Sequence, residues 1–128
     1  MIVAGIGCRK GATATEIDAA IDAALQEAGL TPENLTSLAT SDGKGSEQGL
    51  LDVAAARGLQ ITLVKPAALQ AAGPRTKSFS PRVNEMFGVP SVAEGAALAA
   101  AGPDAALLAP RIVLGPVTCA LASTTREP

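Results

Sequence analysis

The sequence predicts an α/β fold in which a mixed, mostly parallel sheet is covered by helices on both faces and ends in a C-terminal hairpin. Short apolar runs alternate with helix-like segments through most of the chain. The last stretch instead holds two apolar runs around Gly115-Pro116, a pattern typical of a hairpin. We expect residues 1–128 to form a single domain, because 128 residues suffice for one core and no repeat or linker divides them.

The first strand and the first helix have clear sequence signals. Met1–Ile6 is a short apolar run, which predicts a buried strand. Thr13 stands three residues before Glu16, a capping-box pattern that begins a helix. Gly29 is expected to end that helix. Between them, apolar side chains recur at helical spacing: Ile17, Ile21, Ala24, Leu25 and Ala28.

The middle of the chain continues in the same strand–helix order. A turn at 32–34 leads to a second strand over 35–40 and a polar, glycine-rich loop over 41–46. The elements that follow are a helix over 47–57 capped by Ser46 and ended by Gly58, a strand over 59–64, and a short helix that begins at Pro66 and ends near Gly73.

The last third begins with an irregular, basic stretch over 73–80. The remaining expected elements are a short helix opened by Ser80-Pro81 and ended by Gly88, an alanine-rich helix with a Ser91/Glu94 capping box that ends at Gly102, a hairpin of 105–113 with 117–122, and a frayed tail over 124–128.

Composition excludes several classes of function. The chain has no histidine, so Ser-His-Asp and Cys-His catalysis are excluded within it. A net charge of −2 and only two aromatic residues, Phe79 and Phe87, argue against a nucleic-acid partner. Cys8 and Cys119 lack metal-ligand spacing and are expected to be free thiols, and we expect no metal and no resident cofactor. The sequence shows no signal peptide or membrane span, which predicts a soluble, cytoplasmic protein without a membrane partner.

The stretch Gly7-Cys8-Arg9-Lys10-Gly11 is the first candidate site, because it lies between a strand and a helix start. Glycines let the backbone approach a ligand, the helix N-terminus favours anions, and Arg9 and Lys10 add positive charge. The alternative is a tight turn with two solvated basic residues. Cys8 is a weak candidate nucleophile, since cations and a helix N-terminus lower a thiol pKa; the alternative is a small buried hydrophobic side chain.

Lys44 and Glu47 form the second candidate. If the first two strands are parallel neighbours, their following loops open at the same sheet edge, where ligands of open α/β folds bind. Lys44 would then face the Gly7–Gly11 loop. The alternatives are a solvated loop charge for Lys44 and favourable placement at a helix N-terminus for Glu47.

The third candidate is the loop Arg75–Ser80, which carries charge and ends at Ser80. It could act as a lid, or Phe79 could simply anchor it to the core. Thr118, in the last strand, has a structural alternative as a hairpin residue.

Dinucleotide and Walker motifs fail on spacing. The glycine after Gly5-x-Gly7 comes four residues later, and Gly45 follows Gly43-Lys44 where Ser or Thr is required. A small nucleotide- or phosphate-binding regulatory module using the same loops remains the alternative function.

Several motifs together resemble the CobE/CbiG C-terminal family of cobalamin (vitamin B12) biosynthesis; CbiG is the cobalt-precorrin-5A hydrolase. They are Gly5-Ile6-Gly7-Cys8-Arg9-Lys10-Gly11, Lys44 with Glu47-x-Gly49-Leu50, Gly88-Val89-Pro90-Ser91-Val92-Ala93-Glu94, and Val117-Thr118. The resemblance covers nearly the whole chain and implies a three-layer α/β/α sandwich. It also implies a tetrapyrrole ligand, a precorrin, whose carboxylates suit separated cationic loops.

The resemblance implies two roles. The chain lacks the rest of CbiG, so a carrier or chaperone for precorrins is favoured over catalysis. If the protein is an enzyme, it is a hydrolase acting on a precorrin lactone, with Glu47 to activate water. We expect ligand contacts from Gly7, Cys8, Arg9, Lys10, Gly11, Lys44, Glu47, Ser80 and Thr118. Other cobalamin-pathway enzymes are candidate partners, and a pure assembly subunit without a ligand is a further alternative.

Overall fold

The computed structural model describes residues 1–44, 47–77, 91–108 and 111–124, with the side chain of Lys44 left out. The expected cap Ser46, the expected helix from Ser80 to Gly88 and the tail beyond Thr124 lie outside the described residues. No helix in the described ranges is long and apolar enough to cross a bilayer.

A mixed sheet runs through the middle of the molecule in the order β3-β2-β1-β6-β4, and β5 also pairs with β6. β1, β2 and β3 are parallel, whereas β6 runs antiparallel to β1, β4 and β5. The strands are β1 Ile2–Cys8, β2 Ser37–Ser41, β3 Ile61–Val64, β4 Ala105–Leu107, β5 Ile112–Leu114 and β6 Val117–Thr124.

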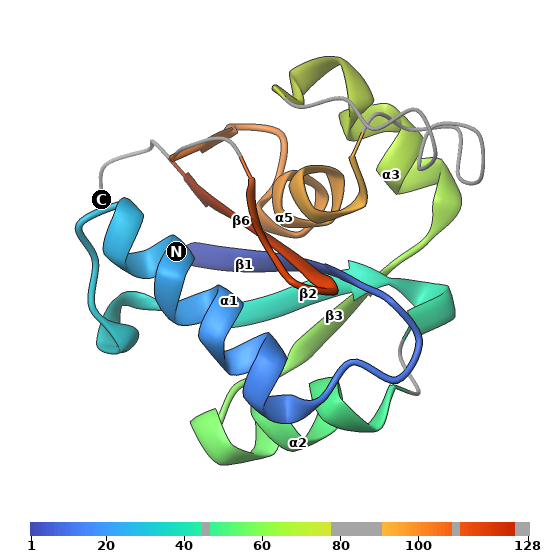
Figure 1. Cartoon of the computed structure of the whole chain (residues 1–128). Helices are drawn as coiled ribbons and strands as arrows, with labels where there is room; N and C mark the ends of the chain where they lie inside the picture. Colours follow the sequence, from blue (N-terminus) through green and yellow to red (C-terminus); the bar gives the residue numbers. More distant parts are fainter. Residues whose placement is uncertain (45–46, 78–90, 109–110, 125–128) are drawn as a thin grey trace.

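Helices cover both faces of this sheet (Figure 1). One face carries α1 (Ala14–Glu27) and α2 (Gln48–Arg57), whose apolar side chains share a core with Ile6 and Leu38. The opposite face carries α3 (Pro66–Ala72) and α5 (Val92–Ala101). The predicted three-layer α/β/α sandwich is therefore confirmed. Short 3₁₀ turns occupy Pro32–Asn34 (η1), Asp42–Lys44 (η2) and Gly73–Arg75 (η3).

Local signals set most helix ends as predicted, but the predicted cap of α2 was wrong, because its N-cap is Glu47 and not Ser46. The Thr13 hydroxyl accepts a hydrogen bond from the Glu16 amide, and the Glu16 side chain accepts one from the Thr13 amide, a complete capping box. α2 ends at Gly58 in the left-handed region, at φ 66°. Arg57 then ties α2 to α1, because its guanidinium donates to Asp18 at 2.8 Å and to Asp22 at 2.9 Å.

The first strand is longer than predicted, and the last hairpin is less regular. β1 continues through Gly7 and Cys8, because β6 pairs with it along its whole length, from Ile2↔Ser123 to Cys8↔Val117. The outer strand of the hairpin divides into β4 and β5. Arg111, directly before β5, donates its amide to the buried Glu94 carboxylate at 2.9 Å.

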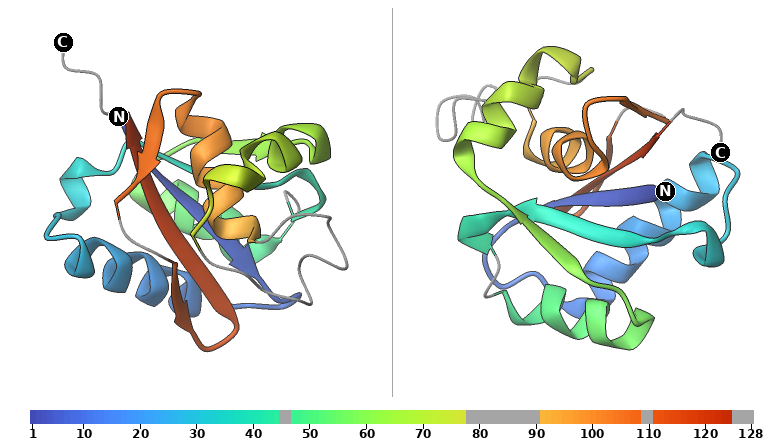
Figure 2. Two further views of the ribbon diagram at one scale, coloured as in Figure 1. Left: turned by 90° about the horizontal axis from the view of Figure 1, so that it is seen from above. Right: turned by 180° about the vertical axis from the view of Figure 1, so that it is seen from behind.

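The start of β1 and the end of β6 lie side by side in this sheet. The amide of Thr124 donates to the Met1 carbonyl at 3.3 Å, and Figure 2 shows the start of β1 next to the end of β6. The central strand β1 therefore has the last strand as one neighbour and β2 as the other.

α5 packs almost directly on β1. A Cβ built on Gly5 would lie 2.7 Å from the Ala97 nitrogen and 2.9 Å from the Ala97 Cβ, with the Ala93 carbonyl oxygen nearer still. Only glycine at position 5 lets the helix backbone come this close. This contact places the N-terminus of α5 over the carboxyl end of β1, at the edge that holds the candidate site.

Candidate functional site

The carboxyl ends of β1 and β2 lie next to each other, as the parallel pairing requires. Two loop segments leave this edge: residues 9–13 lead to α1, and η2 (Asp42–Lys44) follows β2 on the way to Glu47, the N-cap of α2. In open α/β sheets, loops at this edge are the usual ligand site. The structure thus brings the first and second candidate segments to one edge, as predicted.

Glu47 joins the two loops. Its Oε1 accepts a hydrogen bond from the Gly11 amide at 3.0 Å, and its backbone forms the N-cap of α2. Gly11 has a φ of +84°, a conformation that side-chain-bearing residues rarely adopt. Gly49, in the first turn of α2, has no room for a side chain, because a Cβ there would press on the Ala12 carbonyl and lie 3.1 Å from the Ala14 nitrogen. The two loops are therefore braced against each other by one hydrogen bond and one close backbone contact.

Gly7 and Thr118 meet across the β1–β6 pair. The Thr118 hydroxyl donates to the Gly7 carbonyl at 3.1 Å, and a Cβ on Gly7 would lie 2.6 Å from that hydroxyl oxygen. Thr118 therefore lies at the candidate site, although its hydroxyl already supports the strand. Of the two cysteines, Cys8 is half-buried against the α1 and α2 core. Burial raises the pKa of the Cys119 thiol to about 12, even though nearby Arg57 lowers it, which makes Cys119 a poor nucleophile.

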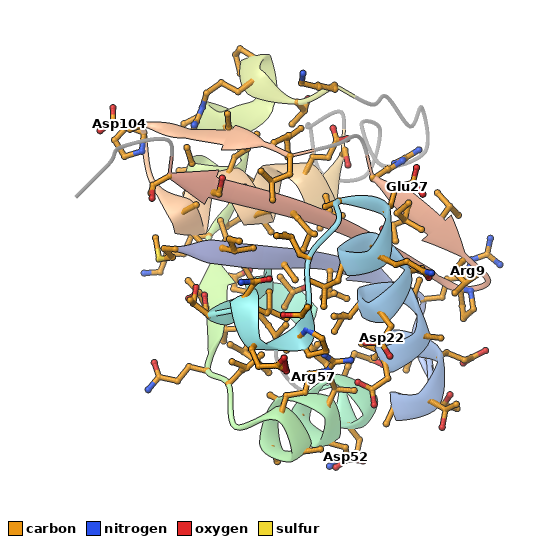
Figure 3. The ribbon with its side chains drawn as sticks, turned by 90° about the vertical axis from the view of Figure 1, so that its left-hand side faces the viewer. Arg9, Asp22, Glu27, Asp52, Arg57 and Asp104 are labelled. Atoms are coloured by element: carbon orange, nitrogen blue, oxygen red, sulfur yellow. The ribbon has the colours of Figure 1, made fainter. Side chains whose placement is uncertain are left out.

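The cations of the candidate site lie at its rim. Arg9 and Lys10 are exposed. The Arg9 amide donates to the Pro116 carbonyl at 3.0 Å, and Figure 3 shows the Arg9 side chain at the outside of the molecule, near the hairpin. Lys44 ends η2, directly after β2, so its backbone belongs to the same edge. Ser80 lies outside the described residues.

Arg75, which opens the third candidate loop, has a structural contact. Its guanidinium donates to the carbonyl of Gly102, the C-cap of α5, at 3.2 Å and to that of Ala105, the first residue of β4, at 3.0 Å. The bond to Gly102 satisfies a carbonyl at the end of α5, where a basic side chain is favourable. Arg75 is therefore held away from the loops that carry Gly11 and Glu47.

Glu94 has a role that the sequence pattern did not reveal. The Ser91 hydroxyl accepts from the Glu94 amide at 3.3 Å, which is one half of the predicted capping box. The Glu94 carboxylate, with no exposed area, instead accepts from the amides of Lys77 at 2.8 Å and Arg111 at 2.9 Å. It connects the N-terminal turn of α5 to two other segments of chain. The capping-box pattern marked the right residue, but its local spacing cannot show distant partners.

The site offers hydrogen-bond donors and positive charge at its rim. Within the described ranges, no three Cys, Asp or Glu side chains gather closely enough to hold a metal ion. Backbone amides, helix N-termini and the basic side chains of Arg9 and Lys10 suit an anionic ligand.

Comparisons with known proteins identify the family. Residues 2–122 match the family described as the cobalamin synthesis G C-terminus, and the chain belongs to this family. It is a cobalamin biosynthesis protein related to the C-terminal part of CbiG.

Individual relatives agree with this placement. Protein CobE from Sinorhizobium sp is 35% identical over 121 residues, which are 94% of this chain and 79% of that protein. A crystal structure of CobE, a protein from the cobalamin (vitamin B12) biosynthetic pathway, matches with a TM-score of 0.93 and 36% identity, covering 100% of this chain and 93% of the other. The cobalt-precorrin-5A hydrolase of Priestia megaterium is 30% identical over 104 residues, 81% of this chain but only 27% of that longer protein.

Proposed function

We propose that this protein binds a precorrin, a tetrapyrrole precursor of cobalamin, at the edge formed by the carboxyl ends of β1 and β2. The observation that carries the proposal is the hydrogen bond from the Gly11 amide to the Glu47 carboxylate, which braces the loop of Arg9 and Lys10 against the segment that follows Lys44. Precorrins carry acetate and propionate groups around a broad apolar ring. Separated cationic groups and helix N-termini complement such a ring of carboxylates.

We further propose a carrier or chaperone role in the cytoplasm, in which the protein hands a labile intermediate to other enzymes of the pathway. Glu47 is the candidate base for lactone hydrolysis, but one of its oxygens already accepts the Gly11 amide. By accepting this hydrogen bond, the Glu47 carboxylate orients the loop that contains Gly11. Support for ring opening comes from the hydrolase relative, of which this chain spans only 27%. Binding without bond cleavage therefore fits the described residues better than hydrolysis does.

The test uses cobyrinic acid, a stable corrin with free carboxylates, and its methyl ester, which has the same ring without charges. We expect the visible bands of cobyrinic acid to shift on mixing with the protein, and the ester to bind at least tenfold more weakly. Arg9→Gln and Lys44→Gln should each weaken binding roughly 10- to 150-fold, because a charge-assisted hydrogen bond contributes roughly 1.5–3 kcal/mol.

The matched control is Gln60→Glu, which makes the same change in net charge at the opposite end of the sheet, where Gln60 is exposed. This variant should bind as the wild type does. An unchanged spectrum of cobyrinic acid at high protein excess would refute corrin binding. Thermal stabilisation by nucleotides instead would favour the nucleotide- or phosphate-binding alternative.

A further inference from the structure

A buried hydroxyl at the end of β2 has no hydrogen-bond partner. Ser41 is 3% exposed, and its Oγ is the one buried side-chain oxygen or nitrogen among the described residues that lacks a partner. Burying a hydroxyl in this way costs free energy. Buried polar groups in native proteins are almost always paired. The unpaired Ser41 hydroxyl therefore indicates a position at which a ligand atom would accept its hydrogen bond.

The Ser41 side chain faces α5. The register that pairs Val3 with Ser37 and Gly5 with Ala39 continues to set Ser41 beside Gly7. Neighbours in register point to the same face of a sheet, and Gly7 presents its α5-facing side. On the other side, Ser41 pairs with Val64, which packs in the core beneath α3 and α5.

The first turn of α5 lies above this spot. A Cβ placed on Gly7 would be 3.8 Å from the Ala93 nitrogen and 3.9 Å from the Val92 Cβ. The Ser91 hydroxyl accepts a hydrogen bond from the Glu94 amide. The amides of Val92 and Ala93, in the same first turn, have no acceptor within the helix. These two amides and the positive end of the helix dipole therefore lie on the same side as the Ser41 hydroxyl.

The charges around the first turn of α5 are compatible with a bound anion. Glu94 is the acidic residue of this turn, and its carboxylate oxygens accept amides from Lys77 and Arg111. Its charge is thus engaged by donors from other segments. The spot is also buried, since Ser91, Val92 and Ala93 are 0, 7 and 1% exposed.

We propose that Ser41, Val92 and Ala93 form a subsite for one carboxylate group, bound by the hydroxyl and the two amides. Three donors suit the two oxygens of a carboxylate. Because these residues are buried, the group that we assign to the subsite is the end of a short arm, such as an acetate side chain, and not a ring. The proposal deepens the precorrin function proposed above and rests on it for the identity of the ligand, but not for the chemistry of the subsite.

The experiment follows the amide resonances of Val92 and Ala93 by NMR in the wild type, Ser41→Ala and Ser37→Ala. Ser37 lies on the same face of the same strand, at its other end, and serves as the matched control. The probes are sodium acetate, inorganic phosphate, sodium chloride at equal ionic strength, and cobyrinic acid. We expect acetate and cobyrinic acid to shift both resonances in the wild type and in Ser37→Ala, but not in Ser41→Ala.

Two further readouts separate the subsite from a structural role. Ser41→Ala should weaken cobyrinic acid binding at least about tenfold, and it should melt no lower than the wild type, because it removes an unpaired buried hydroxyl. Lower thermal stability with unchanged binding would instead identify a hydroxyl paired with buried water, and would overturn the proposal.

The outcomes also separate the two proposals. Acetate shifts without any binding of cobyrinic acid would support the subsite and refute the precorrin function. The subsite alone would be refuted if cobyrinic acid binds without shifting the Val92 and Ala93 amide resonances and binds Ser41→Ala as tightly as the wild type. A response to phosphate but not to acetate would overturn the assignment of a carboxylate.

Discussion

Replacing Gly5 by alanine should destabilise the protein strongly, because α5 packs on the bare backbone of β1. The new Cβ would lie 2.7 Å from the Ala97 nitrogen, and ordinary contact begins at 3.4 Å, so the helix must retreat by at least about 0.7 Å. A gap of roughly 0.5–1 Å forfeits a quarter to a half of a van der Waals contact. Much of α5 is buried, so we expect a loss at the upper end of the overpacking range, about 3 kcal/mol.

Urea unfolding followed by circular dichroism measures this loss, which corresponds to a roughly hundredfold fall in the folding equilibrium constant. Gly43→Ala is the matched control, since a Cβ there has nothing within 4 Å and Gly43 does not have a positive φ. The control should change the free energy of unfolding by less than about 1 kcal/mol. If Gly5→Ala unfolds at the same urea concentration as Gly43→Ala, the argument from close packing is refuted.

Three other substitutions test separate parts of the structure. Gly49→Ala should cost about 1–3 kcal/mol of stability and weaken cobyrinic acid binding, because the new Cβ forces the braced loops apart. Gly95→Ala is the control and should be tolerated, because a Cβ there comes no nearer than 3.4 Å to another residue. Equal effects of the two substitutions would contradict the close contact between the loops. Burial raises the pKa of the Cys119 thiol from 9.0 to about 12, so the unfolded thiol ionises first and stability should fall as pH rises from 9 towards 12. Cys119→Ala should reduce that fall in urea unfolding, and an identical pH profile would argue against it. Glu94→Gln places an amide NH₂ against a backbone N–H and should lower the free energy of unfolding by about 2–3 kcal/mol, measured by thermal unfolding. Glu27→Gln, at an exposed position, is the control and should leave stability unchanged. An unchanged stability of Glu94→Gln would show that the carboxylate is dispensable.

The helix boundaries followed from the sequence because their signals are local. The Thr13 capping box and Gly58 act within a few residues of the backbone that they shape. Apolar periodicity likewise marked which side of α1 would be buried. The sheet edge was predictable for a related reason, since parallel strands with intervening helices must open their loops on one side.

The parts that were missed depend on partners distant in sequence. Gly7 reads as the start of a turn, yet pairing with Thr118 keeps it in β1. Glu94 has the spacing of a capping box, yet its carboxylate accepts amides from Lys77 and Arg111. Glu47 was expected near the first loop, but no pattern in its own segment names the Gly11 amide as its donor.

The pairing of β1 with β6 has a consequence for how the chain folds. The central strand finds one of its two neighbours in the last strand, so the sheet closes only when segments from opposite ends of the sequence meet. Such non-local pairing raises contact order and slows folding. Until residues 117–124 are made, one edge of β1 is open to strands of other molecules. Loss of residues 117–124 should therefore leave β1 with an unpaired edge and cause the protein to aggregate.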